Sequence, residues 1–359
     1  MRYLLIFLAA STALAQPAPQ TQSSHTEESL RGASAVSQQI AWASGTHGTY
    51  LRTTDGGRNW IPALVPDAGT IDFRGVVAFS ADEAFLMSAG PGEQSRIYHT
   101  SDAGEHWKLQ FTGKNPKTFF DAMAFWDARH GIVLGDPVPD ESGQLKFQLL
   151  ITSDGESWSP MPTSQLPPAL EGEGAFAASN SCIAILGASD GNIWFATGGR
   201  AARVFHSADR GSAWQVFDTP IMHGPDSAGI FSVAFRDPRH GVIAGGDYKH
   251  PDEDGPNLAF TNDGGKSWTL SKIYPQSYYS AVAYDRKSLN AASKDLDDNQ
   301  AHVRLFIAGP KFIFDFRPPQ NPVRISPGKK SGLQFNAVSG YPSGGALVVG
   351  PKGSIAAIH

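Results

Sequence analysis

A short motif, Ser/Thr-x-Asp-x-Gly-x-x-Trp, recurs along this chain and constrains its fold more than any other feature. Four copies have the full pattern and a fifth is one residue short. The five segments are Thr53–Trp60, Thr100–Trp107, Thr152–Trp158, Ser207–Trp214 and Thr261–Trp268, and we call them the Asp-Trp turns. Their aspartates are 47, 52, 55 and 54 residues apart, a spacing typical of one supersecondary unit repeated along a solenoid or around a ring.

Each Asp-Trp turn contains the residues that a tight connection between two antiparallel strands requires. The aspartate can accept hydrogen bonds from backbone N–H groups of its own turn, and the glycine two positions later allows a positive φ. The tryptophan stands where the returning strand begins, so its ring can be buried between neighbouring sheets. Because the constellation occurs five times at one place in the repeat, a structural role is favoured over a catalytic one, which needs a single copy.

A second pattern, an aromatic residue followed by alternating small apolar residues, accompanies the repeat. Alternation with period two, bounded by Gly, Pro and Asp, predicts β-strands, and no comparable stretch has a sustained helical period. The pattern begins at Phe73, Phe120, Phe176 and Phe231, and again without an Asp-Trp turn at Tyr279 and Phe335. With a degenerate copy at the start of the chain, units begin near residues 33, 73, 119, 176, 231, 279 and 335.

Seven units of this length predict an all-β fold, a seven-bladed β-propeller whose blades have four strands each. The last unit, which ends at Ser354–His359, has room for only three strands. We expect its outer strand to come from residues just before 33, so that the two ends of the chain pair and close the ring.

The first fifteen residues have the composition of a secretory signal peptide. A basic start is followed by the apolar run Leu4–Ala10 and the small residues of Ala13–Ala15, so we expect cleavage after Ala15 and a periplasmic or secreted protein. Residues 16–31, rich in Gln, Pro, Ser and Thr, predict a flexible leader. Residues 32–359 are expected to form a single propeller domain and a monomer.

Charge and cysteine content narrow the classes of partner. The chain has 29 Lys+Arg and 34 Asp+Glu, a net charge of −5, with no basic stripe, so we expect no nucleic-acid partner. No stretch after the signal reaches the roughly 18 apolar residues of a transmembrane helix. Cys182 is the one cysteine, which excludes an intramolecular disulfide, and its apolar neighbours predict a core position.

Two histidines and one acidic loop are the candidate metal ligands of the chain. His130 and His240 occupy equivalent Arg-His-Gly turns in two units, but no Cys or His cluster has the spacing of a metal site. The acidic run Asp252–Asp254 lacks the remaining ligands of a calcium loop. We therefore expect no metal and no cofactor.

Together, the Asp-Trp turns and the aromatic strand starts resemble the Asp-box, or bacterial-neuraminidase-repeat, β-propellers over nearly the whole predicted domain. The strings Asp127–Asp136 and Asp237–Asp247 are similar to the photosystem II stability/assembly factor family. This resemblance implies an exported, non-enzymatic platform that holds a protein client, such as a subunit of a membrane complex, during assembly. The resemblance also implies binding of the client through a basic patch, as in photosynthetic members of the family, whereas this chain is acidic and its arginines are dispersed.

The alternative function is that of a carbohydrate-active glycoside hydrolase, because sialidases have the same turns. A sialidase needs an arginine cluster and an Arg-Ile-Pro motif, and the nearest string here, Phe73-Arg74-Gly75, lacks the Ile-Pro. Other hydrolases use two carboxylates across a cleft. The candidate carboxylates for such a reaction are Asp121, Asp136, Glu173 and Asp247.

Residues that follow the inner strands should surround the axis of the ring, where side chains from every blade meet. The candidate binding residues on this central face are Asp136, Glu173, Ser179, Asn180, Arg203, Asp247, Tyr248 and Lys249. We assign no catalytic residue. Asp136 and Asp247 occupy matched positions in two units, which also fits a structural role in capping glycine turns.

Overall fold

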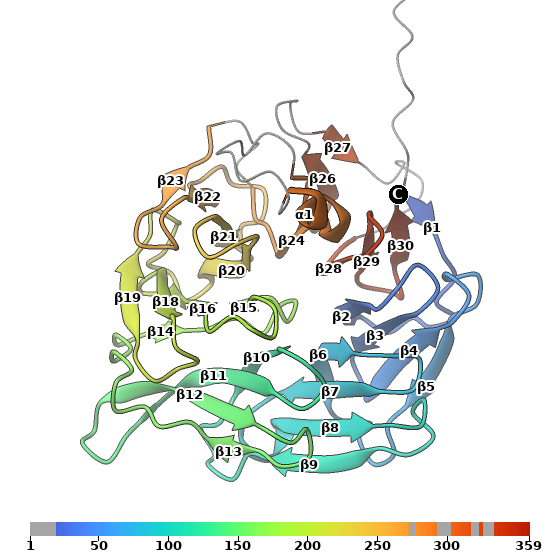
Figure 1. Ribbon diagram of the computed structural model, residues 1–359, viewed down its shortest axis with the longest axis horizontal. Coiled ribbons are helices and arrows are strands. Elements are labelled where there is room, and N and C mark those ends of the chain that lie inside the picture. The colour runs from blue at the N-terminus through green and yellow to red at the C-terminus, as the bar shows by residue number, and fades with distance from the viewer. Residues whose placement is uncertain (1–18, 273–276, 293–302, 317–322, 326–333) are drawn as a thin grey trace, which may run out of the picture.

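The computed structural model describes residues 19–272, 277–292, 303–316, 323–325 and 334–359. Its strands form seven sheets arranged as blades around a central axis (Figure 1), which confirms the predicted all-β, seven-bladed propeller. The predicted signal peptide, residues 1–15, lies outside the described residues. Helix α1 (Arg286–Ala292) is the one α-helix within the described ranges, and no helix there has the length and apolar character to span a membrane.

Blades one to three each contain four antiparallel strands in sequence order from the axis outward. Blade one contains β2 (Leu30–Ala35), β3 (Ala41–Gly45), β4 (Thr49–Thr53) and β5 (Ile61–Leu64). Blade two contains β6 (Asp72–Ala78), β7 (Ala84–Ala89), β8 (Arg96–Thr100) and β9 (Lys108–Thr112). Blade three contains β10 (Phe120–Phe125), β11 (Gly131–Pro139), β12 (Leu145–Thr152) and β13 (Ser159–Pro160).

Blade four has the same order, and blade five is extended by two short strands at its inner edge. Blade four contains β15 (Ile183–Ile185), β16 (Ile193–Ala196), β18 (Arg203–Ser207) and β19 (Gln215–Asp218). Blade five contains β20 (Ala228–Phe235), β21 (Gly241–Asp247), β22 (Leu258–Thr261) and β23 (Thr269–Leu270). The two added strands are β14 (Glu173–Gly174) and β17 (Gly198–Gly199).

The last two blades complete the ring. Blade six contains β24 (Ala281–Tyr284), β25 (Leu305–Gly309), β26 (Phe312–Phe316) and β27 (Val323–Ile325). Blade seven contains β28 (Ala337–Gly340), β29 (Ala346–Val349), β30 (Ile355–Ile358) and, as its outer strand, β1 (Gln20–Thr21). One 3-10 turn, η1 (Gly92–Gln94), precedes β8.

The two ends of the chain pair with one another, which confirms the predicted closure. Gln20 and Thr21 pair antiparallel with Ala357 and Ala356 of β30. The Trp60 indole nitrogen of blade one also donates a hydrogen bond to the Gln22 side chain at 2.8 Å. Strand β1 and the first residues of β2 therefore lie inside the range 16–31 that the composition predicted as a leader.

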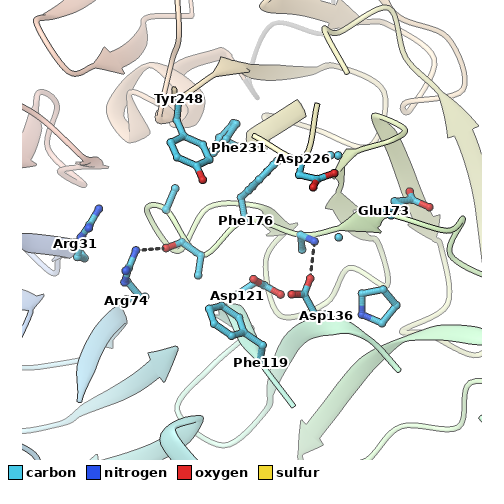
Figure 2. Close-up of a pocket in the computed structure, with 18 of the residues that line it drawn as sticks. Arg31, Arg74, Phe119, Asp121, Asp136, Glu173, Phe176, Asp226, Phe231 and Tyr248 are labelled. Carbon is cyan, nitrogen blue, oxygen red and sulfur yellow. Dashed lines mark hydrogen bonds between the residues drawn. The ribbon is translucent and has the colours of Figure 1, made fainter. Parts of the chain in front are cut away.

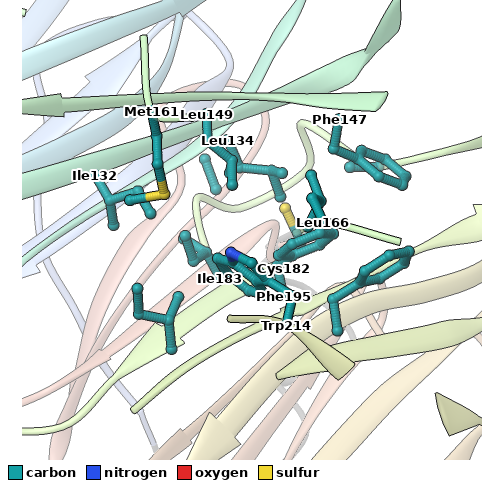
Figure 3. Packing of buried hydrophobic residues seen from close by; sticks show 14 of the residues in the cluster. Ile132, Leu134, Phe147, Leu149, Met161, Leu166, Cys182, Ile183, Phe195 and Trp214 are labelled. Carbon is teal, nitrogen blue, oxygen red and sulfur yellow. The ribbon is translucent and has the colours of Figure 1, made fainter. Parts of the chain in front are cut away.

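The core of the protein is divided into seven hydrophobic clusters, one between each pair of adjacent blades. Strand alternation produces this division: Ile132 and Leu134 of β11 face blade four, whereas Val133 between them faces blade two. Figure 3 shows the cluster between blades three and four, where the fully buried Cys182 packs as a small apolar residue, as predicted. Each blade is thus stabilised by its neighbours, as in other repeat proteins.

All five Asp-Trp turns connect the third and fourth strands of a blade and share one hydrogen-bond pattern. In the first, the Thr53 hydroxyl donates to Asp55 Oδ1 at 2.9 Å and accepts from the Gly57 N–H at 3.0 Å. Asp55 Oδ1 also accepts from the Asn59 N–H at 2.9 Å. Equivalent bonds occur in the other four turns. The predicted structural role of these turns is confirmed.

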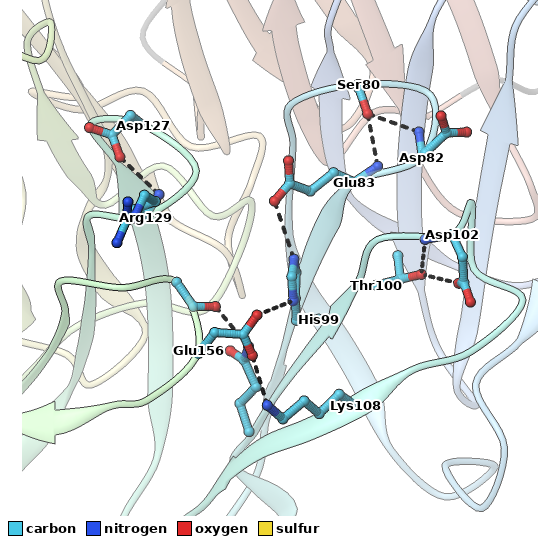
Figure 4. Close-up of polar contacts among 12 residues, drawn as sticks. Ser80, Asp82, Glu83, His99, Thr100, Asp102, Lys108, Asp127, Arg129 and Glu156 are labelled. Atoms are coloured by element: carbon cyan, nitrogen blue, oxygen red, sulfur yellow. Dashed lines mark hydrogen bonds and ion pairs between the residues drawn. The ribbon is translucent and has the colours of Figure 1, made fainter.

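The tryptophan of each turn packs at the interface with the preceding blade. Trp60, Trp158 and Trp214 are buried in three of the clusters between blades, and Trp107 and Trp268 are half-buried against two others. Polar contacts add to this interface at the outer rim. Figure 4 shows one case, in which Glu156 from the turn of blade three forms an ion pair at 2.7 Å with Lys108 of blade two.

One predicted strand start is wrong. The pattern beginning at Phe176 was expected to open blade four, but the inner strand of that blade begins at Ile183. Residues 175–182 form an irregular segment instead. The pattern did not predict this because Phe176, which is half-buried, stacks on the aromatic ring of Phe231 instead of pairing in a strand.

Candidate functional site

A pocket of about 950 Å³ lies on the axis of the propeller. Its wall contains residues of all seven blades or of the loops next to their inner strands, including Arg31, Arg74, Asp121, Phe176, Phe231, Tyr278 and Asn336. Figure 2 shows the arginines on one side of the pocket and the acidic residues Asp121, Asp136 and Asp226 on the other. This volume is typical of sites that bind small molecules or side chains of a partner.

Several side chains reach the axis through β-bulges in the inner strands. The register shifts between Leu30 and Gly32, between Phe73 and Gly75, between Phe120 and Ala122, and between Ile230 and Ser232. The residues left unpaired at these shifts are Arg31, Arg74, Asp121 and Phe231, and all four line the pocket. A bulge locally bends a strand and redirects one side chain, and here it does so at the equivalent place in four blades.

Residues 173–180, which we call the axial segment, begin with β14 and continue along the axial pocket, which residues 173–178 line. The Ala177 carbonyl accepts a hydrogen bond from Arg74 of blade two at 3.0 Å. The Asn180 side chain accepts from the Met123 N–H of blade three at 2.8 Å, and the Ser179 hydroxyl donates to the Ser280 carbonyl near blade six at 2.8 Å. The axial segment therefore connects blades that are not neighbours in the ring.

Glu173, which lines the pocket, and Arg203 form a buried ion pair. Arg203 Nε donates to Glu173 Oε1 at 3.0 Å and its NH2 group donates to Oε2. The Thr197 hydroxyl adds a bond to Oε1 at 2.6 Å, and the Glu173 side chain has no exposed area. With every oxygen bonded inside the protein, this pair anchors the axial segment to blade four.

Asp121 and Asp136 are the two acids that face one another across the pocket floor (Figure 2). Asp121 is completely buried, and neither of its carboxylate oxygens has a hydrogen-bond partner among the described residues. Burial, with a further contribution from the charge of Asp136, raises the pKa of Asp121 well above its usual value. Burial also raises the pKa of Asp136 to about 6, although a hydrogen bond from the Ala175 N–H opposes the change.

Arg31 and Arg74 form the basic side of the pocket. Arg74 bonds to the axial segment and lies 3.7 Å from the carboxylate of Asp72. Arg31 forms no hydrogen bond or ion pair with the described residues, and its Nε atom is buried. Burial, together with the nearby charge of Arg74, lowers the pKa of the Arg31 guanidinium to about 10, which still leaves it charged at neutral pH.

The end of β21 contributes a polar corner to the same face. Tyr248 lines the pocket and is 48% exposed, which leaves its ring available to a ligand. Asp247 is buried, and it accepts bonds from the Lys249 N–H and from His250 Nδ1, both at 2.9 Å. It therefore caps its own turn, whereas the Lys249 side chain is exposed.

The structure places the eight predicted binding residues in two groups. Asp136, Glu173 and Tyr248 line the pocket. The other five are Ser179, Asn180, Arg203, Asp247 and Lys249, which lie around it without lining it. A binding role for any of the eight stays a prediction. Sequence reasoning did not select Arg31, Arg74 or Tyr278 as binding residues, although an apolar-Arg-Gly string marks the bulge at both arginines.

Within the described ranges, one group of side chains has a spacing compatible with a metal ion: Asp102, Glu105 and His106. It lies in an Asp-Trp turn, and none of its three residues lines the pocket. Asp102 already accepts hydrogen bonds from Thr100 and from the His106 N–H. This geometry is explained by the turn and does not require a metal.

No protein-family model matches the chain, and no curated protein matches it in sequence. Solved structures do match. YCF48 bound to D1 peptide has a TM-score of 0.65 at 14% identity, covering 96% of this chain and 98% of YCF48. U3-55K has a TM-score of 0.62 at 9% identity over 95% and 98%, and the WD40 propeller of Doa1 has 0.56 at 10% over 95% and 97%. At these identities the comparisons show a shared fold: this chain is a seven-bladed β-propeller with structural similarity to YCF48.

Proposed function

We propose that this protein is a non-enzymatic binding platform that holds a segment of a protein client in the axial pocket. The observation that carries the proposal is the unpaired Arg31 at the wall of a 950 Å³ pocket built from all seven blades. A guanidinium with free donors binds carboxylates and backbone carbonyls, both of which an extended peptide supplies. The exposed ring of Tyr248 offers an apolar surface beside it.

The similarity to YCF48 supports a peptide rather than a small metabolite as the ligand. That propeller was solved bound to D1 peptide. We propose the same class of ligand, a protein segment, for this chain, with a client of its own. The Asp-Trp turns support placing this chain among the Asp-box propellers. The composition of residues 1–15 supports export, and we propose that the exported protein acts as a monomer in assembly in the cell envelope.

Display of random twelve-residue peptides against residues 16–359 tests this function. We expect enrichment of peptides that bind the wild type and lose at least about tenfold in affinity for Arg31→Gln, because a charged hydrogen bond is removed. Arg58→Gln is the matched control, since Arg58 is exposed on an Asp-Trp turn outside the pocket. If no peptide is enriched, or if both variants bind every peptide as the wild type does, the proposal is wrong.

A glycoside hydrolase is the second candidate, and the pair Asp121 and Asp136 is the observation that favours it. Glycoside hydrolysis uses two acids in one pocket, and burial raises the pKa of both acids here, that of Asp136 to about 6. Incubation with a panel of nitrophenyl glycosides, sialosides included, would reveal it. Release of nitrophenol by the wild type and its loss in Asp136→Asn would favour the hydrolase over the platform.

A further inference from the structure

Asp121 differs from the other buried acids of the protein. Among the described residues, five acidic side chains are buried: Asp121, Glu173, Asp247, Asp285 and Asp315. Four of the five have a basic partner, namely Arg203 for Glu173, His250 for Asp247, and Arg304 for Asp285 and Asp315. Asp121 has none, and neither of its oxygens has a hydrogen-bond partner in the part of the chain that the structure describes. Burying a polar group in this way is costly unless something else compensates it.

The nearest charged groups do not satisfy it. Asp136 is a like charge, and no described Lys, Arg or His forms an ion pair with either acid. The arginines of the pocket, Arg31 and Arg74, come from blades one and two and lie on the other side in Figure 2. The two acids therefore form a cluster of oxygen acceptors at the pocket wall that has no basic partner among the described residues.

The acceptors at this site fit one kind of cation. Asp121 offers two free oxygens, and Asp136 offers Oδ2, since its Oδ1 accepts the Ala175 N–H. A lysine ammonium group has three donors and is compact, whereas a guanidinium is a wide planar fork with five donors. Phe119 lies beside Asp121 at the pocket wall in Figure 2 and provides apolar surface for the carbon stem of a lysine.

We propose that Asp121 and Asp136 bind the ammonium group of a lysine side chain that the client segment inserts into the axial pocket. This inference rests on the proposed function, because it assumes that the pocket receives a protein segment. It adds the chemistry of one position in that segment. Burial raises the pKa of both acids because it disfavours their charged forms. A cation bound to the two acids favours those charged forms and so opposes the effect of burial.

The direct test uses a minimal ligand. Residues 16–359 are titrated by NMR with Nα-acetyl-lysine methylamide and with the matched uncharged Nα-acetyl-norleucine methylamide. We expect the lysine amide to perturb the pocket resonances at concentrations about tenfold lower than the norleucine amide does, and Asp136→Asn to remove about that much affinity. Asp121→Asn is the second variant, and Asp218→Asn, which changes an exposed acid of β19, is the control.

Each outcome decides the inference. Equal binding of the two amides, or unchanged binding of the lysine amide to Asp136→Asn and Asp121→Asn, would overturn it. If n-butylammonium binds as tightly as the lysine amide, a free amine rather than a peptide is the ligand and the inference also fails. If the peptides enriched by display need Arg31 for binding but need no lysine of their own, the proposed function stands and this inference is wrong.

Discussion

The ring of Phe176 in the axial segment stacks on the ring of Phe231 in β20, with centroids 3.9 Å apart and planes 9° apart. Phe231 is the residue left unpaired by the bulge between Ile230 and Ser232, so the bulge is what presents its ring to the axis. The stack joins the axial segment to the inner strand of blade five. It also depends on the absence of a side chain at Gly198, where a Cβ atom would collide with the Phe176 ring.

Replacing Gly198 by alanine should therefore destabilise the protein. The new methyl group would displace Phe176 and would lie 2.9 Å from the Ala228 carbonyl oxygen, and we expect a loss of about 1–3 kcal/mol of unfolding free energy. Urea unfolding followed by tryptophan fluorescence measures it. Gly69→Ala is the control, because a Cβ at Gly69 has no atom within 4 Å. Equal stability of the two variants would show that the stack does not constrain the segment.

Trp214→Ala should leave a cavity between blades three and four. Trp214 is 7% exposed and packs in the cluster shown in Figure 3, so we expect a loss of about 3–5 kcal/mol. We expect smaller losses for Trp107→Ala and Trp268→Ala, since both rings are half-buried. Leu109→Ala, which shortens a residue 47% exposed on β9, should change stability little. A loss no greater for Trp214→Ala than for Leu109→Ala in urea unfolding would contradict the structural role of the turns.

The buried pair of Glu173 and Arg203 should behave as a coupled unit. Glu173→Gln and Arg203→Met each leave one buried group without its charge partner, and we expect each to cost about 3–5 kcal/mol. The double variant removes both charges, so its loss should be clearly smaller than the sum of the two. A double-mutant cycle by urea unfolding measures the coupling. Additive losses would mean that the two side chains do not anchor the axial segment together.

The raised pKa of Asp136 predicts that the free energy of unfolding decreases as the pH rises through about 6. Its pKa is raised from 3.8 to about 6 in the fold, chiefly by burial, so the ionised form is disfavoured. Its contribution is greatest below pH 3.8, where the carboxyl is protonated in both states, and is lost as the pH rises through 6. Asp136→Asn should therefore gain stability relative to the wild type at pH 8 but not at pH 4. Thermal unfolding at the two pH values checks this, and a gain of equal size at both would refute it.

The Asp-Trp turns predict a loss of stability at acid pH. Hydrogen bonds from the backbone and side chain of Asn59 lower the pKa of Asp55 to about 2, and bonds from His106 do the same for Asp102. Because these pKa values are below the ordinary 3.8, the contribution is complete above pH 3.8 and is lost as the pH falls through 2. In Asp102→Asn the free energy of unfolding should depend less steeply on pH between pH 5 and pH 2 than in the wild type. An unchanged slope would contradict the role assigned to Asp102.

The amino-acid sequence determined the repeat, the β class, the number of blades and the closure of the ring. It did so because the information is local: an Asp-Trp turn contains its own hydrogen-bond donors and acceptors within eight residues, as Thr53, Asp55 and Gly57 show. The position of each tryptophan at a blade interface follows from the same short motif. The missing outer strand of blade seven was predictable because an incomplete last unit leaves one strand to be supplied from elsewhere.

Only the tertiary structure decided which side chains meet at the axis. Arg31, Arg74 and Asp121 reach the pocket because bulges turn them out of the strand alternation, and no period in the sequence predicts that. Ser179 and Asn180 bond to residues 101 and 57 positions away, on blades that the ring alone brings near. The site on the propeller axis is assembled from residues of all seven blades, and its chemistry depends on how the closed ring orients them.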